Sequence, residues 1–207
     1  MKKIFLLIGM IVVFITHLRA QTEFGLRAGV NAPSYTYGDS EALSSAKSIL
    51  SFYVAGYVDA RVSKNLHLYP EVSLQGKGAR IVKSGELGGS EIVQRVNWVD
   101  FAFNFLHKSP LTTLGDFYVG AGPYLGFAMN GENKYPDGTS SAVIIYKENA
   151  VKSIDYGANV LVGVKVGSRF SLNAGYRQGI ANITYDVNKW SSNIKNRVFS
   201  LGAGVSL

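Results

Sequence analysis

The 207-residue chain contains no cysteine, which excludes disulfide scaffolds, thiolate zinc sites and cysteine nucleophiles. Charge is also scarce, because Asp, Glu, Lys and Arg make up 17% of the residues, against about 25% in an average soluble domain. Glycine and aromatic residues are abundant instead, with 23 Gly, 12 Tyr and 11 Phe. This composition is typical of a β-rich chain whose surroundings are not water alone.

The N-terminal segment differs from the rest of the chain. Two lysines precede an apolar run from Ile4 to Ile15, and Ala20 ends the segment. The pattern predicts a secretory signal peptide over residues 1–20, with one mature domain at 21–207. An uncleaved anchor is the alternative, but a spanning helix needs about 20 apolar residues.

Cleavage removes Lys2, Lys3 and Arg19 and lowers the formal net charge from +7 to +4. No run of Lys and Arg and no nucleic-acid motif remains in the mature chain. We therefore expect no nucleic-acid partner.

The mature chain has no apolar run long enough for a transmembrane helix, but about eight segments alternate between apolar and polar residues. Alternation over about 10 residues is the signature of membrane-barrel strands. The expected strands are Glu23–Asn31, Phe52–Val62, Leu66–Lys77, Val93–His107, Phe117–Met129, Ser153–Val166, Phe170–Ile180 and Arg197–Leu207.

The connections between these segments alternate in length. Short turns are expected at Ser63–Asn65, Lys108–Asp116 and Gly167–Arg169. Long loops are expected at Ala32–Ser51, Gly78–Ile92, Asn130–Lys152 and Ala181–Asn196. In outer-membrane barrels short turns face the periplasm and long loops face outside. The pattern predicts an all-β, eight-stranded, antiparallel up-and-down transmembrane barrel in the outer membrane.

One face of each segment is apolar and the other is small, polar or charged, as Phe117 and Val119 alternate with Tyr118 and Gly120. A soluble barrel would turn the apolar face inward, whereas a membrane barrel turns it to lipid. Aromatic residues in the strands favour lipid-facing girdles, although core packing would also use them. They are Phe52, Trp98, Phe101, Phe103, Phe105, Phe117, Phe127, Tyr156, Phe170, Tyr176 and Phe199.

The polar faces carry eight charges, which we expect in the lumen as a structural salt-bridge network. They are Arg27, Asp59, Arg61, Glu71, Asp100, Asp155, Lys165 and Arg177. Arg27, Glu71 and Asp100 fall at mid-depth, Asp59, Arg61 and Lys165 nearer the periplasm, and Asp155 and Arg177 toward the outer end, where those two could pair. A proton or ion pathway is the alternative.

The segments resemble the outer-membrane β-barrel domain family of Bacteroidota that includes PorT-like proteins. The resemblance covers essentially the whole mature chain and implies an eight-stranded barrel inserted in the outer membrane. It does not imply a shared biochemical activity. The matching pieces are FGLRAGVN, LYPEVSLQGKGA, VNWVDFAF, FYVGAGPYLGF, DYGANVLVGV, NAGYRQGIANI and NRVFSLGAGVSL.

No constellation for catalysis is visible, so we expect no catalytic, cofactor-binding or metal-binding residues. His67 and His107 are placed toward the periplasmic ends of their strands, one as a lumen residue and one as a rim residue. Pro70 and Pro123 lie inside strands and each removes a ladder hydrogen bond. They indicate a bulge near a rim, or else a seam that gives a lipid or hydrophobic ligand sideways access to the lumen.

The sequence thus predicts a monomeric, non-enzymatic barrel with outer-membrane lipid around it, a closed charged lumen and four extracellular loops that could bind a protein. The alternatives are a PorT-like accessory factor of protein secretion, a small-solute channel and a lipid-acting enzyme.

Overall fold

The computed structural model describes residues 22–37, 44–83, 90–112, 115–142, 151–184 and 193–207, so the expected signal peptide at 1–20 lies outside the described residues. The strands in this part of the chain are β1 (Thr22–Tyr37), β2 (Ser44–Lys47), β3 (Ser51–Arg61), β4 (Leu66–Lys83), β5 (Ser90–Thr112), β6 (Gly115–Lys134), β7 (Ser140–Ala142), β8 (Ile154–Val166), β9 (Phe170–Gly179) and β10 (Ile194–Ser206). Among the described residues, no helix combines the length and apolarity needed to cross a membrane.

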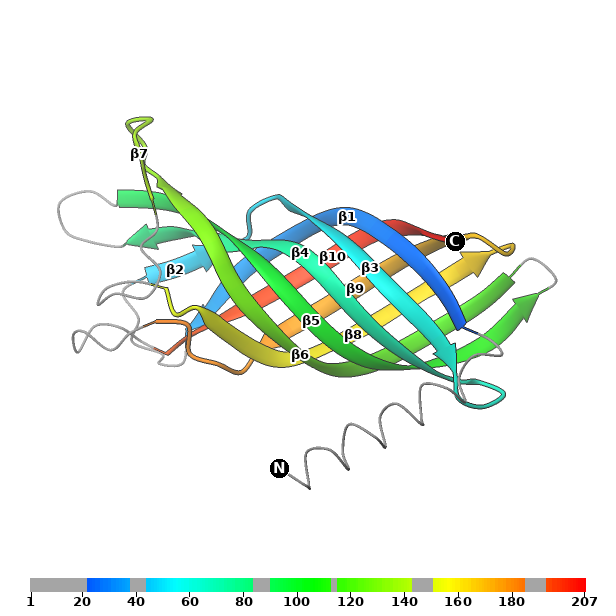
Figure 1. The fold of residues 1–207 in the computed structure, drawn as a ribbon. Coiled ribbons are helices and arrows are strands. Elements are labelled where there is room, and N and C mark those ends of the chain that lie inside the picture. Colours follow the sequence, from blue (N-terminus) through cyan, green and yellow to red (C-terminus); the bar gives the residue numbers. More distant parts are fainter. Residues whose placement is uncertain (1–21, 38–43, 84–89, 113–114, 143–150, 185–192) are drawn as a thin grey trace, which may run out of the picture.

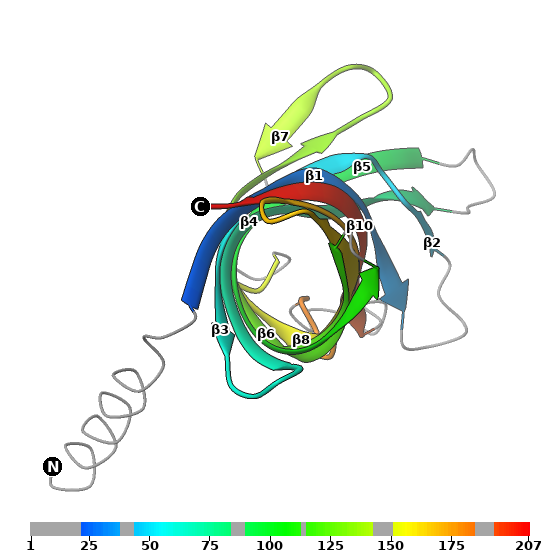
Figure 2. The ribbon, with the colours of Figure 1, turned by 90° about the vertical axis from the view of Figure 1, so that its right-hand side faces the viewer.

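Eight of these strands close into a ring (Figure 1). Strands β1, β3, β4, β5, β6, β8, β9 and β10 each pair antiparallel with the next in the chain, and β10 pairs back with β1. Figure 2, which looks along the barrel, shows the closed ring. The predicted fold class is confirmed, because every segment expected to be a strand contributes one to the wall.

Residues alternate between the inside and the outside of the ring, as successive side chains of a strand must. In β8, Asp155 and Asn159 are buried, whereas Tyr156 and Val160 are exposed on the outer face. The aromatic residues expected on the outer face are all exposed there except Trp98, which is 1% exposed and lies inside. Trp98 shares the inward parity of Asp100 on β5, so its expected place in a girdle was wrong.

The wall reaches further at the long-loop end than the alternation predicted. Strands β4 and β5 stay paired up to Lys83 and Ser90, within the expected loop Gly78–Ile92. Strand β2 adds to β4 from within another expected loop, and β7 pairs with the extended end of β6. The alternation did not predict these extensions, because strands beyond the lipid-facing part of the wall need no apolar face. Backbone hydrogen bonds alone can continue the pairing there.

The opposite end of the barrel has tight connections. Strand β3 ends at Arg61 and β4 begins at Leu66, while β8 and β9 are joined through Gly167, whose φ of 62° suits glycine. Strand β5 ends at Thr112 and β6 begins at Gly115, so both strands extend into the expected turn at Lys108–Asp116. We call this the short-turn end and the other the long-loop end.

Candidate functional site in the barrel lumen

Six charged side chains meet near the middle of the barrel interior, and we call them the ionic chain. Their side chains are between 0 and 7% exposed, since each occupies an inward position of its strand. They are Arg27 on β1, Glu71 and Lys77 on β4, Asp100 on β5, Asp155 on β8 and Arg177 on β9.

Acids and bases alternate along the ionic chain. Arg27 pairs with Glu71, and Arg177 joins Glu71 to Asp100, with Nη2 2.6 Å from Glu71 Oε1 and Nη1 2.6 Å from Asp100 Oδ2. Lys77 Nζ then lies 3.0 Å from Asp100 Oδ2 and 2.9 Å from Asp155 Oδ2. Three bases and three acids leave no net charge, and every buried charge has a partner of opposite sign.

Neutral side chains also contact these charges. Tyr124 Oη and Asn196 Nδ2 donate hydrogen bonds of 3.0 and 2.9 Å to Asp155 Oδ2. The Lys77 ammonium also lies 4.9 Å from the ring centre of Trp98 and 4.7 Å from that of Tyr124. Aromatic faces attract cations, so both rings add to the contacts that hold the Lys77 ammonium in place.

An apolar cluster lies between the ionic chain and the long-loop end, and we call it the outer cluster. It gathers side chains from strands and from segments between strands: Tyr35, Ala79, Val96, Trp98, Ala128, Val151 and Ile183. Val151 and Ile183 lie outside the barrel strands, and Lys152 N donates a 2.7 Å hydrogen bond to Ile183 O beside them. These segments therefore fold over the mouth of the barrel.

A second cluster, the inner cluster, lies between the ionic chain and the short-turn end. It consists of Tyr57, Tyr69, Leu106, Tyr118 and Leu161. The rings of Tyr57 and Tyr69 stack with their centres 4.6 Å apart. Two glycines make room for the rings, because a Cβ on Gly25 would lie 2.2 Å from the Tyr57 ring and one on Gly163 would lie 2.4 Å from the Tyr118 ring.

Further charges lie at the short-turn end. Asp59 pairs with Lys108 and lies 2.6 Å from His67 Nδ1, and Lys165 pairs with Glu23 at 2.5 Å. The Asp59 and His67 side chains are 6% and 14% exposed, so this group is less buried than the ionic chain. Along the barrel axis the order is therefore a charged rim, the inner cluster, the ionic chain and the outer cluster.

The structure places most of the charges expected in the lumen inside the barrel. Arg27, Glu71, Asp100, Asp155 and Arg177 join the ionic chain, whereas Asp59 and Lys165 lie at the short-turn rim. His67 faces the lumen beside Asp59, and His107 is exposed.

Two expectations about these charges were wrong. Arg61 is exposed, because β3 ends there and the guanidinium donates 3.1 Å hydrogen bonds to the carbonyls of Ser63 and Lys64 in the turn. Asp155 and Arg177 do not pair with each other. The register of β8 and β9 sets Asn159 opposite Arg177, so Asp155 lies further toward the long-loop end and meets Lys77 instead.

Sequence reasoning missed Lys77, Lys108 and Glu23 as members of ion pairs. Lys77 had a readable signal, since it shares the inward parity of Glu71 on β4. Lys108 was expected in a turn, and the extension of β5 to Thr112 brings it into the wall. No group of three or more potential metal ligands occurs in the described ranges.

Comparison with known proteins settles the family. A family model described as "Outer membrane protein beta-barrel domain" matches residues 19–185. The chain belongs to this family. Its barrel is therefore an outer-membrane barrel, and the exposed apolar face of the wall is the face that meets lipid. A search of curated proteins found no match.

Solved structures that are similar to this chain include three outer-membrane proteins. OprG from Pseudomonas aeruginosa is 9% identical with a TM-score of 0.50, over 89% of this chain and 95% of OprG. Neisserial surface protein A is 15% identical with a TM-score of 0.49, over 90% of this chain and 99% of that one. Ail, the attachment invasion locus protein of Yersinia pestis, is 11% identical with a TM-score of 0.44, over the same shares. At 9% identity the likeness to OprG shows the fold alone.

Proposed function

We propose that this protein is a closed, non-enzymatic barrel whose task is to hold extracellular loops in the outer membrane and present them to a protein partner. In this proposal the long-loop end faces outside, the short-turn end faces the periplasm, and the barrel works as a monomer. The observation that carries the proposal is the neutral ionic chain enclosed between two packed clusters.

The contacts in the lumen support closure. An eight-stranded barrel is only wide enough for its own side chains to fill. A permeating ion would have to separate pairs such as Arg177 and Asp100, whose atoms are 2.6 Å apart at 0–7% exposure. Separating buried partners is costly, and the outer and inner clusters pack on either side of these pairs. The same contacts count against the ion-pathway and small-solute-channel alternatives.

The long-loop end supports presentation. Strands β6 and β7 form a hairpin that projects beyond the ring in Figures 1 and 2. Its turn is internally bonded, since Tyr135 N donates to Thr139 O at 3.0 Å and Thr139 donates two hydrogen bonds to Asp137 Oδ1. Those bonds from Thr139 lower the pKa of the Asp137 carboxyl, which keeps it ionised in an exposed turn. Tyr135 is 37% exposed at the same site.

Conductance in planar bilayers tests closure. We expect the purified, unheated barrel to add no steady current, because the ionic chain and both clusters block the lumen. A general porin in the same bilayers is the positive control. Steady, barrel-dependent current would overturn the closed-lumen proposal.

Crosslinking in living cells tests presentation. A photo-crosslinking amino acid at Tyr135, in the projecting turn, should capture a specific protein of defined mass. The matched control places the same amino acid at Ala203, on the lipid-facing side of β10. The same captured protein at both positions, or none at Tyr135, counts against a partner at this hairpin, and a captured second copy counts against a monomer.

The PorT-like resemblance supports a narrower version of the proposal, in which the partner belongs to a protein-secretion system. Deletion of the gene should then reduce the secreted protein fraction, and the protein captured from Tyr135 should be required for secretion as well. An unchanged secreted fraction would remove this version and leave the general one. Residues 1–20 act in either version as a signal peptide, and an intact mass beginning at Gln21 tests that assignment.

A further inference from the structure

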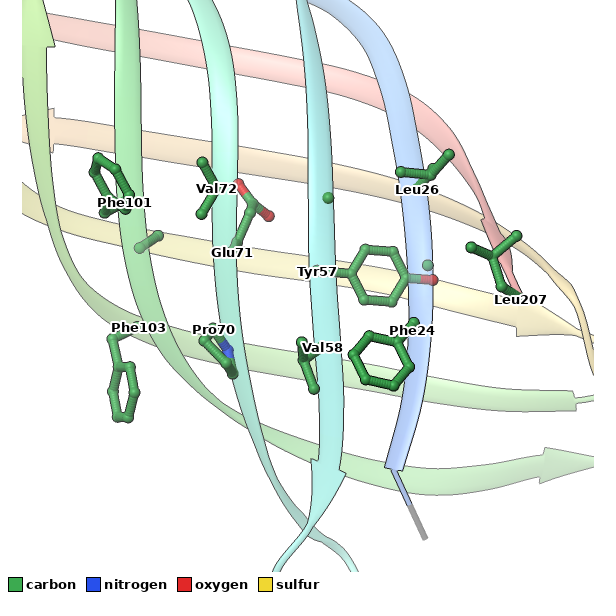
Figure 3. A pocket seen from close by; sticks show the side chains of 13 residues that line it. Phe24, Leu26, Tyr57, Val58, Pro70, Glu71, Val72, Phe101, Phe103 and Leu207 are labelled. Atoms are coloured by element: carbon green, nitrogen blue, oxygen red, sulfur yellow. The ribbon is translucent and has the colours of Figure 1, made fainter. Parts of the chain in front are cut away.

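The lipid-facing wall has a hollow near the short-turn end, with a volume of about 620 Å³ (Figure 3). It crosses four strands, β1, β3, β4 and β5. One row of outward side chains borders it on the side of the short turns and includes Phe24, Val58 and Phe103. Another row on the far side includes Leu26 and Phe101. The outward side chains that line the hollow are all apolar, and we call it the wall groove.

The groove exists because one outward position has no side chain. Gly56 follows the exposed Phe52 and Val54 on the outer face of β3. A Cβ built on Gly56 would meet nothing closer than Leu26 Cδ2, at 3.8 Å. A larger side chain therefore has space there without strain in the backbone. Position 56 is therefore a point at which a single substitution can obstruct the groove.

The strand ladder is also interrupted beside the groove. Pairing between β3 and β4 runs to Tyr57 and Glu71 and resumes at Ala60 and Leu68. Pro70 lies in the gap and has no N–H to donate, as its position in the strand predicted. The floor of the groove is formed by inward-facing residues including Tyr57 and Glu71. Behind the groove the lumen is occupied by paired side chains, among them Glu71 with Arg27 and Arg177.

We propose that the wall groove binds one acyl chain of a phospholipid in the leaflet at the short-turn end, with the phosphate near Arg61 and Lys64. An apolar hollow in a wall that lies within the bilayer meets hydrocarbon chains, and its volume is in the range of small-molecule sites. Val58 lies three residues before Arg61, about 10 Å along the strand. Both Arg61 and Lys64 are exposed and cationic, which suits the anionic phosphate of a lipid whose chain enters the groove.

This proposal rests on the outer-membrane wall and not on the closed lumen or on a protein partner. It can therefore fail while the proposed function holds, and the reverse is also true. The wall groove holds an acyl chain whether or not the extracellular loops bind a protein.

Native mass spectrometry of the barrel, after reconstitution with phosphatidylethanolamine and transfer to mild detergent, tests the site. We expect the unmodified protein to retain one phospholipid, and Gly56→Leu to lower the retained fraction at least fivefold because the leucine side chain projects into the groove and obstructs it. Ala158→Leu is the matched control, since it adds the same side chain at an exposed position on β8. Equal retention by the unmodified protein and Gly56→Leu would overturn the proposal, as would equal loss in the Ala158→Leu control.

A second comparison separates the acyl chain from the phosphate. Lys64→Gln should reduce retention of phosphatidylethanolamine but not of diacylglycerol, which has the same chains and no phosphate. Retention of phosphatidylethanolamine that is unaffected by Lys64→Gln would overturn the phosphate contact. The shift in gel mobility on heating shows that each variant is folded, so a loss of lipid cannot be mistaken for a loss of the barrel.

Discussion

The two faces of one strand meet opposite demands in this barrel. On β4, Glu71 is 2% exposed and pairs with two arginines, while its neighbour Val72 is 50% exposed on the lipid-facing side. On β8, Asp155 is fully buried beside Lys77, and the adjacent Tyr156 is 52% exposed. One backbone position separates a charge that requires a partner from a side chain that requires hydrocarbon.

The difference shows where the barrel depends on specific neighbours. In the lumen each member of the ionic chain is paired with particular atoms, so the loss of one side chain removes a partner from a buried charge. On the lipid-facing side any apolar side chain satisfies the surroundings, and only a polar or charged one is costly. We therefore expect the stability lost on substitution in the lumen to depend on the partners of the residue. On the lipid-facing side we expect it to depend on the depth of the residue in the bilayer.

The largest effect is expected inside, at Arg177. Arg177→Met removes two ion pairs and leaves Glu71 and Asp100 with one base each, so the free energy of unfolding should fall by about 3–5 kcal/mol. Urea unfolding in lipid vesicles, followed by the shift in gel mobility on heating, measures the change.

Arg80→Met is the matched control, because it removes the same side chain from an ion pair with Glu91 in which both partners are more than 40% exposed. Exposed pairs contribute about 0–1 kcal/mol. An Arg177 variant no less stable than the Arg80 variant would show that the ionic chain does not hold the barrel together.

A smaller effect is expected outside, and it should follow depth. Val160 is exposed on the lipid-facing side at the middle of β8, and Val166 ends the same strand beside the short turn. Val160→Lys should destabilise the barrel by about 2–4 kcal/mol, and Val166→Lys by about 0–1 kcal/mol, because the second lysine reaches the interface. The same unfolding assay compares them. Equal costs at the two positions would contradict the placement of the bilayer around the centre of β8.

The sequence was sufficient to predict the eight wall strands and their two faces, because alternation is a local property of each segment. It was not sufficient for the ion pairs. Arg177 on β9 and Glu71 on β4 are four strands apart in either direction around the ring, and their 2.6 Å contact depends on the register of every strand between them. The pairing expected between Asp155 and Arg177 failed for a local reason, because β8 and β9 are neighbours and their register sets Asn159, not Asp155, opposite Arg177.

The ends of the strands were harder to predict than their centres. Beyond Lys77 on β4 the apolar alternation fades, yet the ladder with β5 continues to Lys83 through backbone hydrogen bonds that any residue can make. The prediction for Arg61 was wrong because the strand ends there. A residue with the inward alternation lies in the lumen only where neighbouring strands surround it, and Arg61 is beyond that point. The alternation along β5 alone would have predicted that Trp98 faces the lumen. That alternation takes precedence over the general preference of aromatic residues for the membrane interface.

The smallest effect is expected from moving a tryptophan from one face to the other, and it gives the most direct view of the two faces. The chain has two tryptophans, so Trp190→Phe leaves Trp98 as the only one. Its emission should be quenched little by phospholipids brominated along their acyl chains, because the ring is 1% exposed and lies against Lys77 in the lumen.

The matched variant adds Trp98→Phe and Phe101→Trp, which moves the indole three residues along β5 to a position that is 48% exposed on the lipid-facing side. Its emission should be quenched several-fold more, although neither variant removes an ion pair. Equal quenching in the two variants would mean that Trp98 reaches lipid, and that the outer cluster does not cover the ionic chain from within.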